Sequence, residues 1–254
     1  MSLSHPPWVS GPTELLQHAL ELLERGGDAN RRFAFIAIDN AVEVAAKTYL
    51  GLPQRVSKLS ITREELSKAE ESFPKLLDSL EKHCSDRLDG VNLGEIEWYH
   101  KLRNQLYHRG NGITVEESKV QIYSQLARLL LKNLFGVDVL PAKANEDPVA
   151  EFLESWSRIE RSLHVLLTTQ AALGKRVAEP RTVHYLSGIA ELSTNGTISR
   201  AAAADLHRLR ELRNQLVHGE ADLKNALRPQ DLSRLSELSK ELQLLEDRHS
   251  GGAT

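Results

Sequence analysis

The sequence predicts an all-α protein made of two helical bundles in tandem, residues 1–140 and 141–254. Leu and Ala dominate its apolar residues, and aromatic residues make up only 5% of the chain, a composition that favours helices over sheets. Apolar residues recur at helical spacing between glycine and proline stops. One short segment also occurs twice, once in each half of the chain, which indicates a repeated module.

The first half begins with two adjacent predicted helices. One is expected to start near Thr13, as N-cap, and to stop at Gly26. The next spans 29–50, and its expected apolar positions are Phe33, Ile36, Ala37, Val44 and Ala45. Residues 62–72 and a restart at Pro74 then predict a helix-turn-helix pair.

Two capping patterns predict the rest of the first bundle. The pair Asn92 and Glu95 is typical of a capped helix start, and this helix is expected to reach His108. Thr114 and Glu117 form a second such pair, at the start of a long amphipathic helix.

Residues 138–147 are expected to link the two bundles, because they contain Pro141 and lack helical periodicity. The second half predicts four helices, the third of them capped by Ser199. Their expected ranges are 152–166 with a stop at Gly174, 181–192, 199–218 and 229–246.

Charge and cysteine content exclude several classes of protein. The formal net charge of −3 argues against an avid general binder of nucleic acid, which needs a strong positive field. Cys84 is the only cysteine, so the chain forms no internal disulfide. We see neither an export signal in 1–12 nor an apolar run long enough for a bilayer. A cytoplasmic protein without a membrane partner is therefore expected.

The repeated segment reads LRNQLYH at 102–108 and LRNQLVH at 212–218, and a glycine follows each copy within two residues. On a helix that turns about 100° per residue, the Arg, Asn and His of each copy share one face, and the two leucines lie opposite. We therefore expect each helix to bury its Leu pair and to turn the polar face away from its own core.

These side chains are suited to ribose chemistry. A histidine exchanges a proton near neutral pH and could deprotonate a ribose 2′-hydroxyl, while an arginine could stabilise the charge that develops on the phosphate. Asn could orient either group, and neither motif brings the carboxylates of a usual metal site, so no metal or other cofactor is expected. The candidate catalytic residues are Arg103, Asn104, His108, Arg213, Asn214 and His218. Tyr107 is a candidate for contact with an RNA base.

Both copies resemble the Arg-x(4–6)-His motif of the HEPN superfamily, in which Asn often follows Arg. The resemblance extends to 39–47 and to 111–114 of the first half, and is weaker in the second. It implies that the two bundles pack as an intramolecular pseudo-dimer whose motifs form one composite site. It also implies a metal-independent endoribonuclease that leaves 2′,3′-cyclic phosphate ends on single-stranded RNA, in bacterial defence, toxin action or RNA processing. An RNA substrate and an unidentified regulatory or antitoxin protein would be its partners.

Other interpretations of the same residues remain open. The chain could be a non-catalytic HEPN module that binds RNA, a nucleotide or a protein partner, as other members of the superfamily do. The bundles could also pair between two chains to give a homodimer. Arg103 and Arg213 could simply pair with acidic side chains to hold helices together. Asp39, Glu43 and Lys47 are interpreted as a solvated or salt-bridged helix face, because such spacing usually has this role.

Overall fold

The computed structural model describes residues 6–109, 115–140, 148–172, 185–218 and 227–250. Within these ranges every regular element is a helix and there is no strand, so the all-α prediction is confirmed. Contacts divide the chain into two compact units, Met1–Glu146 and Asp147–Thr254. No helix in the described ranges is both long enough and apolar enough to cross a membrane.

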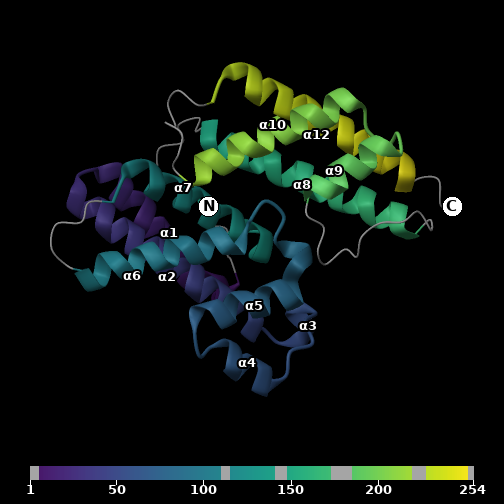
Figure 1. Cartoon of the computed structure of the whole chain (residues 1–254). Helices are drawn as coiled ribbons and strands as arrows, with labels where there is room; N and C mark the ends of the chain where they lie inside the picture. Colours follow the sequence, from purple (N-terminus) through teal and green to yellow (C-terminus); the bar gives the residue numbers. More distant parts are fainter. Residues whose placement is uncertain (1–5, 110–114, 141–147, 173–184, 219–226, 251–254) are drawn as a thin grey trace. The chain divides into compact units, whose positions relative to one another are not determined.

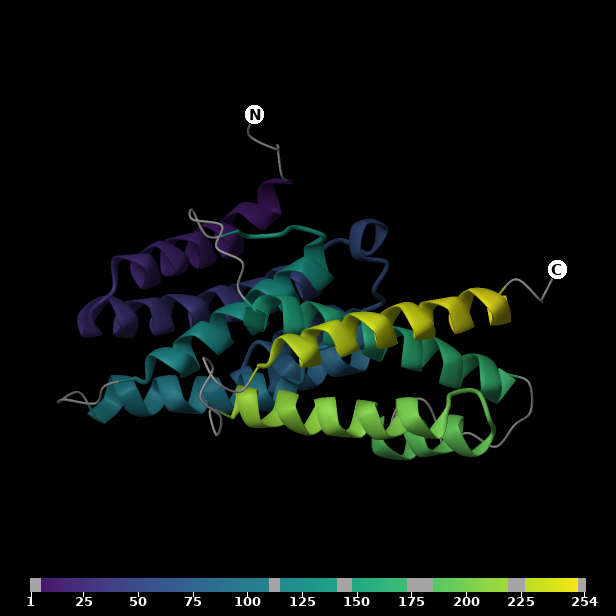
Figure 2. The same ribbon diagram turned by 90° about the horizontal axis from the view of Figure 1, so that it is seen from above.

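The first unit is organised around one long helix, α2, which packs against α1, α5, α6 and α7. Figures 1 and 2 both show α1 and α2, in purple, as an antiparallel pair. The elements are α1 Pro7–Arg25, α2 Asp28–Gly51, α3 Gln54–Ser57, α4 Arg63–Ala69, α5 Phe73–Cys84, the 3₁₀ turn η1 Ser85–Arg87, α6 Leu93–Arg109 and α7 Glu117–Phe135.

Helix α1 starts earlier than the sequence predicts. It begins at Pro7, a favoured first-turn residue, and continues through Pro12. The predicted N-cap Thr13 lies inside the helix, where its hydroxyl donates to the Val9 carbonyl at 2.8 Å. The prediction was wrong because Thr can bond to the preceding turn as well as cap a helix.

Helix α2 has nearly the predicted length but buries a different face. Phe33 is 61% exposed, and Ile36, Ala37 and Val44 are only half-buried. Of the five predicted positions only Ala45 lies on the buried face, which also contains Phe35, Ile38, Ala41, Val42, Ala46 and Tyr49. Since Asp39 also lies on this face, the correction places a carboxylate inside the first unit.

An aromatic cluster fills the core beside α2. The rings of Tyr99 and Tyr123 stack with centroids 4.5 Å apart, and Phe35 meets Tyr123 edge-on at 5.6 Å. All three side chains are fully buried. Such ring contacts fix side-chain orientation as well as burying apolar area. They hold α2, α6 and α7 together next to the polar residues of α6.

Most of the predicted helix ends are confirmed. Thr62 forms a capping box with Glu65 at the start of α4, and Asn92 Oδ1 accepts a hydrogen bond from the Gly94 N–H at 2.9 Å. Gly136 ends α7 in the left-handed region at φ 70°, which glycine adopts without strain. The Thr114 cap is wrong, because the N-cap of α7 is Glu116; Thr114 itself lies outside the described residues.

The second unit consists of α8 Pro148–Ala172, α9 Tyr185–Thr194, α10 Arg200–Val217 and α12 Pro229–Ser250. Helix α8 packs along α12, and α10 contacts both α9 and α12. Trp156 is buried in its core and donates to Glu160 of the same helix at 2.7 Å. Ser199 caps α10 by accepting a hydrogen bond from the Ala202 N–H at 3.0 Å, as predicted.

Candidate functional site

The first copy of the motif lies in the last turns of α6. Arg103 and Asn104 are half-buried, and Arg103 Nη1 donates to Asn104 Oδ1 at 3.0 Å. Leu106 is buried but Leu102 only half-buried, so the predicted Leu face is confirmed at one of its two positions. The side chains of Tyr107 and His108 lie outside the described part of the chain.

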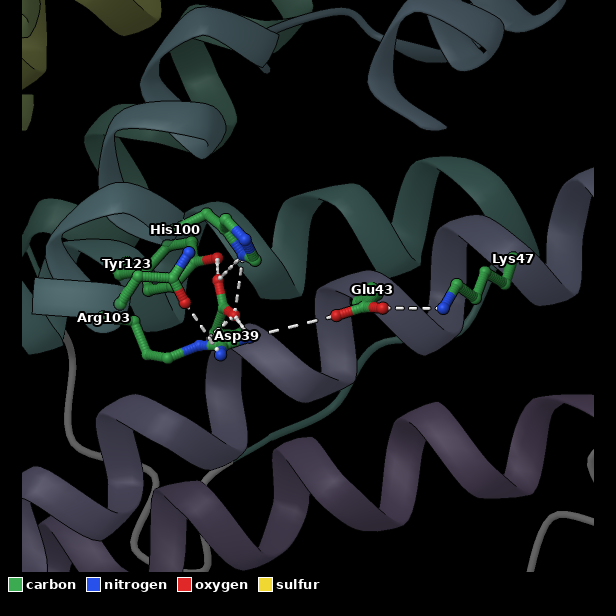
Figure 3. A network of polar contacts seen from close by, with 7 residues as sticks. Asp39, Glu43, Lys47, His100, Arg103 and Tyr123 are labelled. Atoms are coloured by element: carbon green, nitrogen blue, oxygen red, sulfur yellow. Dashed lines mark hydrogen bonds and ion pairs between the residues drawn. The ribbon is translucent and has the colours of Figure 1, made fainter. Parts of the chain in front are cut away.

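Arg103 forms an ion pair with Asp39, which is fully buried (Figure 3). The Arg103 Nε and Nη2 atoms lie 2.7 and 2.5 Å from the same carboxylate oxygen, Oδ2. Charge-assisted bonds of this length are among the strongest in proteins. Helix α2 therefore supplies the anion that holds the motif's arginine. This pairing agrees with the structural interpretation of Arg103. It also agrees with a salt-bridged role for Asp39, whose burial rules out the solvated alternative.

Two further side chains contact the same carboxylate. The Tyr123 hydroxyl of α7 donates to Asp39 Oδ1 at 2.8 Å, and His100 Nδ1 lies 3.0 Å from Oδ2 and 3.2 Å from Oδ1. Because an ionised carboxylate only accepts hydrogen bonds, the proton lies on His100 Nδ1. Asp39 thus joins α2, α6 and α7 through one buried group.

His100 and Tyr123 were not predicted from the sequence as site residues. His100 precedes Arg103 by one helical turn, so its position on the same face was a usable signal. Tyr123 belongs to the apolar row of α7 and gave no such signal. Both residues matter only because α2 brings Asp39 between them.

Electrostatics favour the ionised form of Asp39. Burial by itself raises the pKa of this carboxyl group, but the hydrogen bond and charge of His100, the charge of Arg103 and the hydrogen bond of Tyr123 outweigh it. The pKa therefore lies below its ordinary value of 3.8. Burial is the main reason why the pKa of Tyr123 lies well above 10.0, and the nearby charge of Asp39 is the second. The hydroxyl therefore remains a donor.

Stability of the first unit should therefore depend on acid through Asp39. A carboxyl group whose pKa is lowered by folding stabilises the folded state above its unfolded pKa, and this contribution is lost as the pH falls through the lower folded value. At about pH 5 we expect wild type to have a higher free energy of unfolding than Asp39→Asn. At about pH 3 this difference should be smaller. Urea unfolding of both proteins measures the difference, and a difference that does not change with pH would contradict the prediction.

Glu43 and Lys47 extend the polar row along α2. Glu43 Oε2 lies 3.9 Å from Arg103 Nη2, and its other oxygen accepts from Lys47 Nζ at 2.7 Å. Both side chains are partly exposed, so this end of the row agrees with the predicted salt-bridged face. An exposed pair of this kind contributes little stability.

The second copy of the motif differs from the first in burial. Arg213 on α10 is only 4% exposed, Asn214 is half-buried, and the exposed His218 follows the last residue of the helix. Leu216 is buried but Leu212 is half-buried. The prediction that Arg213 turns away from the core is wrong. Because α10 contacts both α9 and α12, these helices bury more of its surface than the face that carries the two leucines.

The six candidate catalytic residues are divided equally between the two units. Among the described residues, no group of three or more His, Cys, Asp or Glu side chains is arranged to hold a metal ion. Comparison of the chain with family models gave no match. Comparisons with curated proteins and with solved structures gave none either.

Proposed function

We propose that the chain is a metal-independent endoribonuclease that cleaves single-stranded RNA with the paired Arg-Asn-x-x-x-His motifs. The observation that carries the proposal is that the same segment ends a helix in each of two units, α6 in the first and α10 in the second. A stretch of helix kept for packing alone needs leucines at this spacing, but it does not need Arg, Asn and His together. The resemblance to HEPN ribonucleases is what connects this set of residues with RNA cleavage.

The reaction needs only groups that the motifs supply. One histidine removes the proton from a ribose 2′-hydroxyl, and the 2′-oxygen attacks the adjacent phosphorus while the bond to the 5′-oxygen breaks. The other histidine gives a proton to that leaving oxygen. The products are a 2′,3′-cyclic phosphate and a 5′-hydroxyl, and arginine stabilises the charge on the pentacoordinate phosphate. We propose that His108 and His218 share the two proton transfers in one composite site.

The contacts of Arg103 suit phosphate recognition. Its side chain is 18% exposed although its partner Asp39 is fully buried, so Arg103 lies between the interior and the surface of the first unit. The Nη1 atom lies beside Asn104, on the side away from the two nitrogens that face Asp39. A planar guanidinium held in this way can offer donors to a phosphate oxygen without a change of rotamer.

The test is incubation of purified wild type and the His108→Ala, His218→Ala double variant with end-labelled single-stranded RNA in EDTA. We expect wild type to give fragments that end in cyclic phosphate and the double variant to give none. Circular dichroism controls for folding of the variant. Cleavage that persists in the double variant, or fragments with other ends, would overturn the proposed chemistry.

One observation favours a second function, that of a non-catalytic module which binds RNA, a nucleotide or a protein. Arg103 is neutralised by Asp39, and Arg213 is almost completely buried, which is the arrangement expected of arginines that hold helices together. Fluorescence anisotropy with labelled RNA distinguishes the two functions. RNA binding by wild type without any product would favour the module.

A further inference from the structure

The carboxylate of Asp39 is contacted in an unusual way. Arginine and carboxylate groups commonly pair through two parallel hydrogen bonds, one to each oxygen. Here Arg103 Nε and Nη2 both approach Oδ2, while Oδ1 accepts the Tyr123 hydroxyl at 2.8 Å. Tyr123 thus competes with Arg103 for Oδ1, and both of these guanidinium contacts are made to Oδ2 (Figure 3).

His100 also contacts the carboxylate of Asp39. Its Nδ1 lies 3.0 Å from Oδ2 and 3.2 Å from Oδ1, so it shares with Arg103 the oxygen that the arginine uses. The imidazole ring is stacked on Phe73 of α5, with centroids 3.9 Å apart and planes 9° from parallel. This stacking aims Nδ1 at Asp39, and the side chain of His100 is only 14% exposed.

Aromatic contacts also fix the orientation of the Tyr123 side chain. Its ring is stacked on Tyr99 and contacts the edge of Phe35, and it is fully buried. Two donors from different elements, each oriented by an aromatic contact, therefore converge on one carboxylate. Together the two donors satisfy lone pairs of the buried carboxylate that Arg103 does not use.

We propose that His100 and Tyr123 are positioning residues that hold the Arg103 guanidinium on a single oxygen of Asp39, with its Nη1 edge directed to Asn104 and available to a phosphate group of RNA. The inference rests on the proposed function and deepens it. Without these donors, Asp39 would turn both oxygens to Arg103, and the arginine would be held more tightly and further from Asn104. Each residue acts through Asp39 and does not itself touch the substrate.

The test uses the full chain labelled with ¹⁵N, in which Arg103→Lys assigns the Arg103 Nε–H resonance. His100→Phe keeps a ring to stack on Phe73, and Tyr123→Phe keeps the ring contacts of Tyr123, but each removes a donor. We expect the Arg103 resonance to shift in both variants. We also expect single-stranded 2′-O-methyl RNA, which cannot be cleaved, to bind about tenfold more weakly, the effect of one weakened charge-assisted hydrogen bond.

His100→Gln is the matched control, because its side-chain amide can donate to Asp39, and it should restore both the resonance and the RNA affinity. An Arg103 resonance that is unchanged in His100→Phe and Tyr123→Phe overturns the inference, as does a shifted resonance with wild-type RNA affinity. A shifted resonance in a chain whose wild type neither binds nor cleaves RNA would support the positioning role and overturn the proposed function. The two failures are thus distinguishable.

Discussion

Replacing Asp39 with alanine is expected to destabilise the first unit by about 3–5 kcal/mol, the usual cost of removing one partner from a buried ion pair. The substitution leaves the Arg103 charge without its nearest anion and the buried Tyr123 hydroxyl without its acceptor. A buried donor without a partner is itself costly. Since α2, α6 and α7 all contact this carboxylate, the loss should reach every part of the first unit's core.

Native-state hydrogen exchange of the full chain measures this effect, because peptides from α2, α6 and α7 report on the first unit alone. Asn40→Ala is the matched control: Asn40 is the exposed neighbour of Asp39 on the same helix, and its replacement should change the free energy of unfolding by less than about 0.5 kcal/mol. If Asp39→Ala resembles this control, the carboxylate is not the centre of the network.

Replacing either motif histidine alone is expected to lower the rate of RNA cleavage by about 10²–10⁴-fold, the usual contribution of a general acid or base. In the proposed composite site the two histidines have different proton transfers, so neither His108→Ala nor His218→Ala would leave a complete site. Initial rates on end-labelled RNA measure the effect. His164→Ala, an exposed histidine of α8, is the control and should retain the wild-type rate.

Single variants that keep about half of the wild-type rate would contradict a composite site, since they indicate two independent sites, each with its own acid and base. Mixing the two inactive single variants then distinguishes pairing within a chain from pairing between chains. Composite sites formed between chains regain activity on mixing, because one of the two sites in a mixed dimer has both histidines. Sites formed within each chain stay inactive.

The candidate site shows how far inference from sequence reaches. The repeated segment was enough to single out Arg103 and Asn104 as candidates, because a motif is a local pattern. Asp39 carried only a weak signal, since an aspartate spaced four residues from Glu43 usually lies in a solvated or salt-bridged face. Tyr123 gave none, because a tyrosine in an apolar row is most often part of a core.

The sequence by itself determined the all-α class, the repeated motif and most helix ends, as at Asn92, Ser199 and Gly136, because capping and glycine stops depend on neighbours within a few residues. The tertiary structure alone decided that α2 buries Asp39 and exposes Phe33, and that α10 buries Arg213. A helix has a fixed set of faces, but which of them is buried depends on the helices that cover it. The partners of Arg103 follow from that packing and could not be found by local spacing.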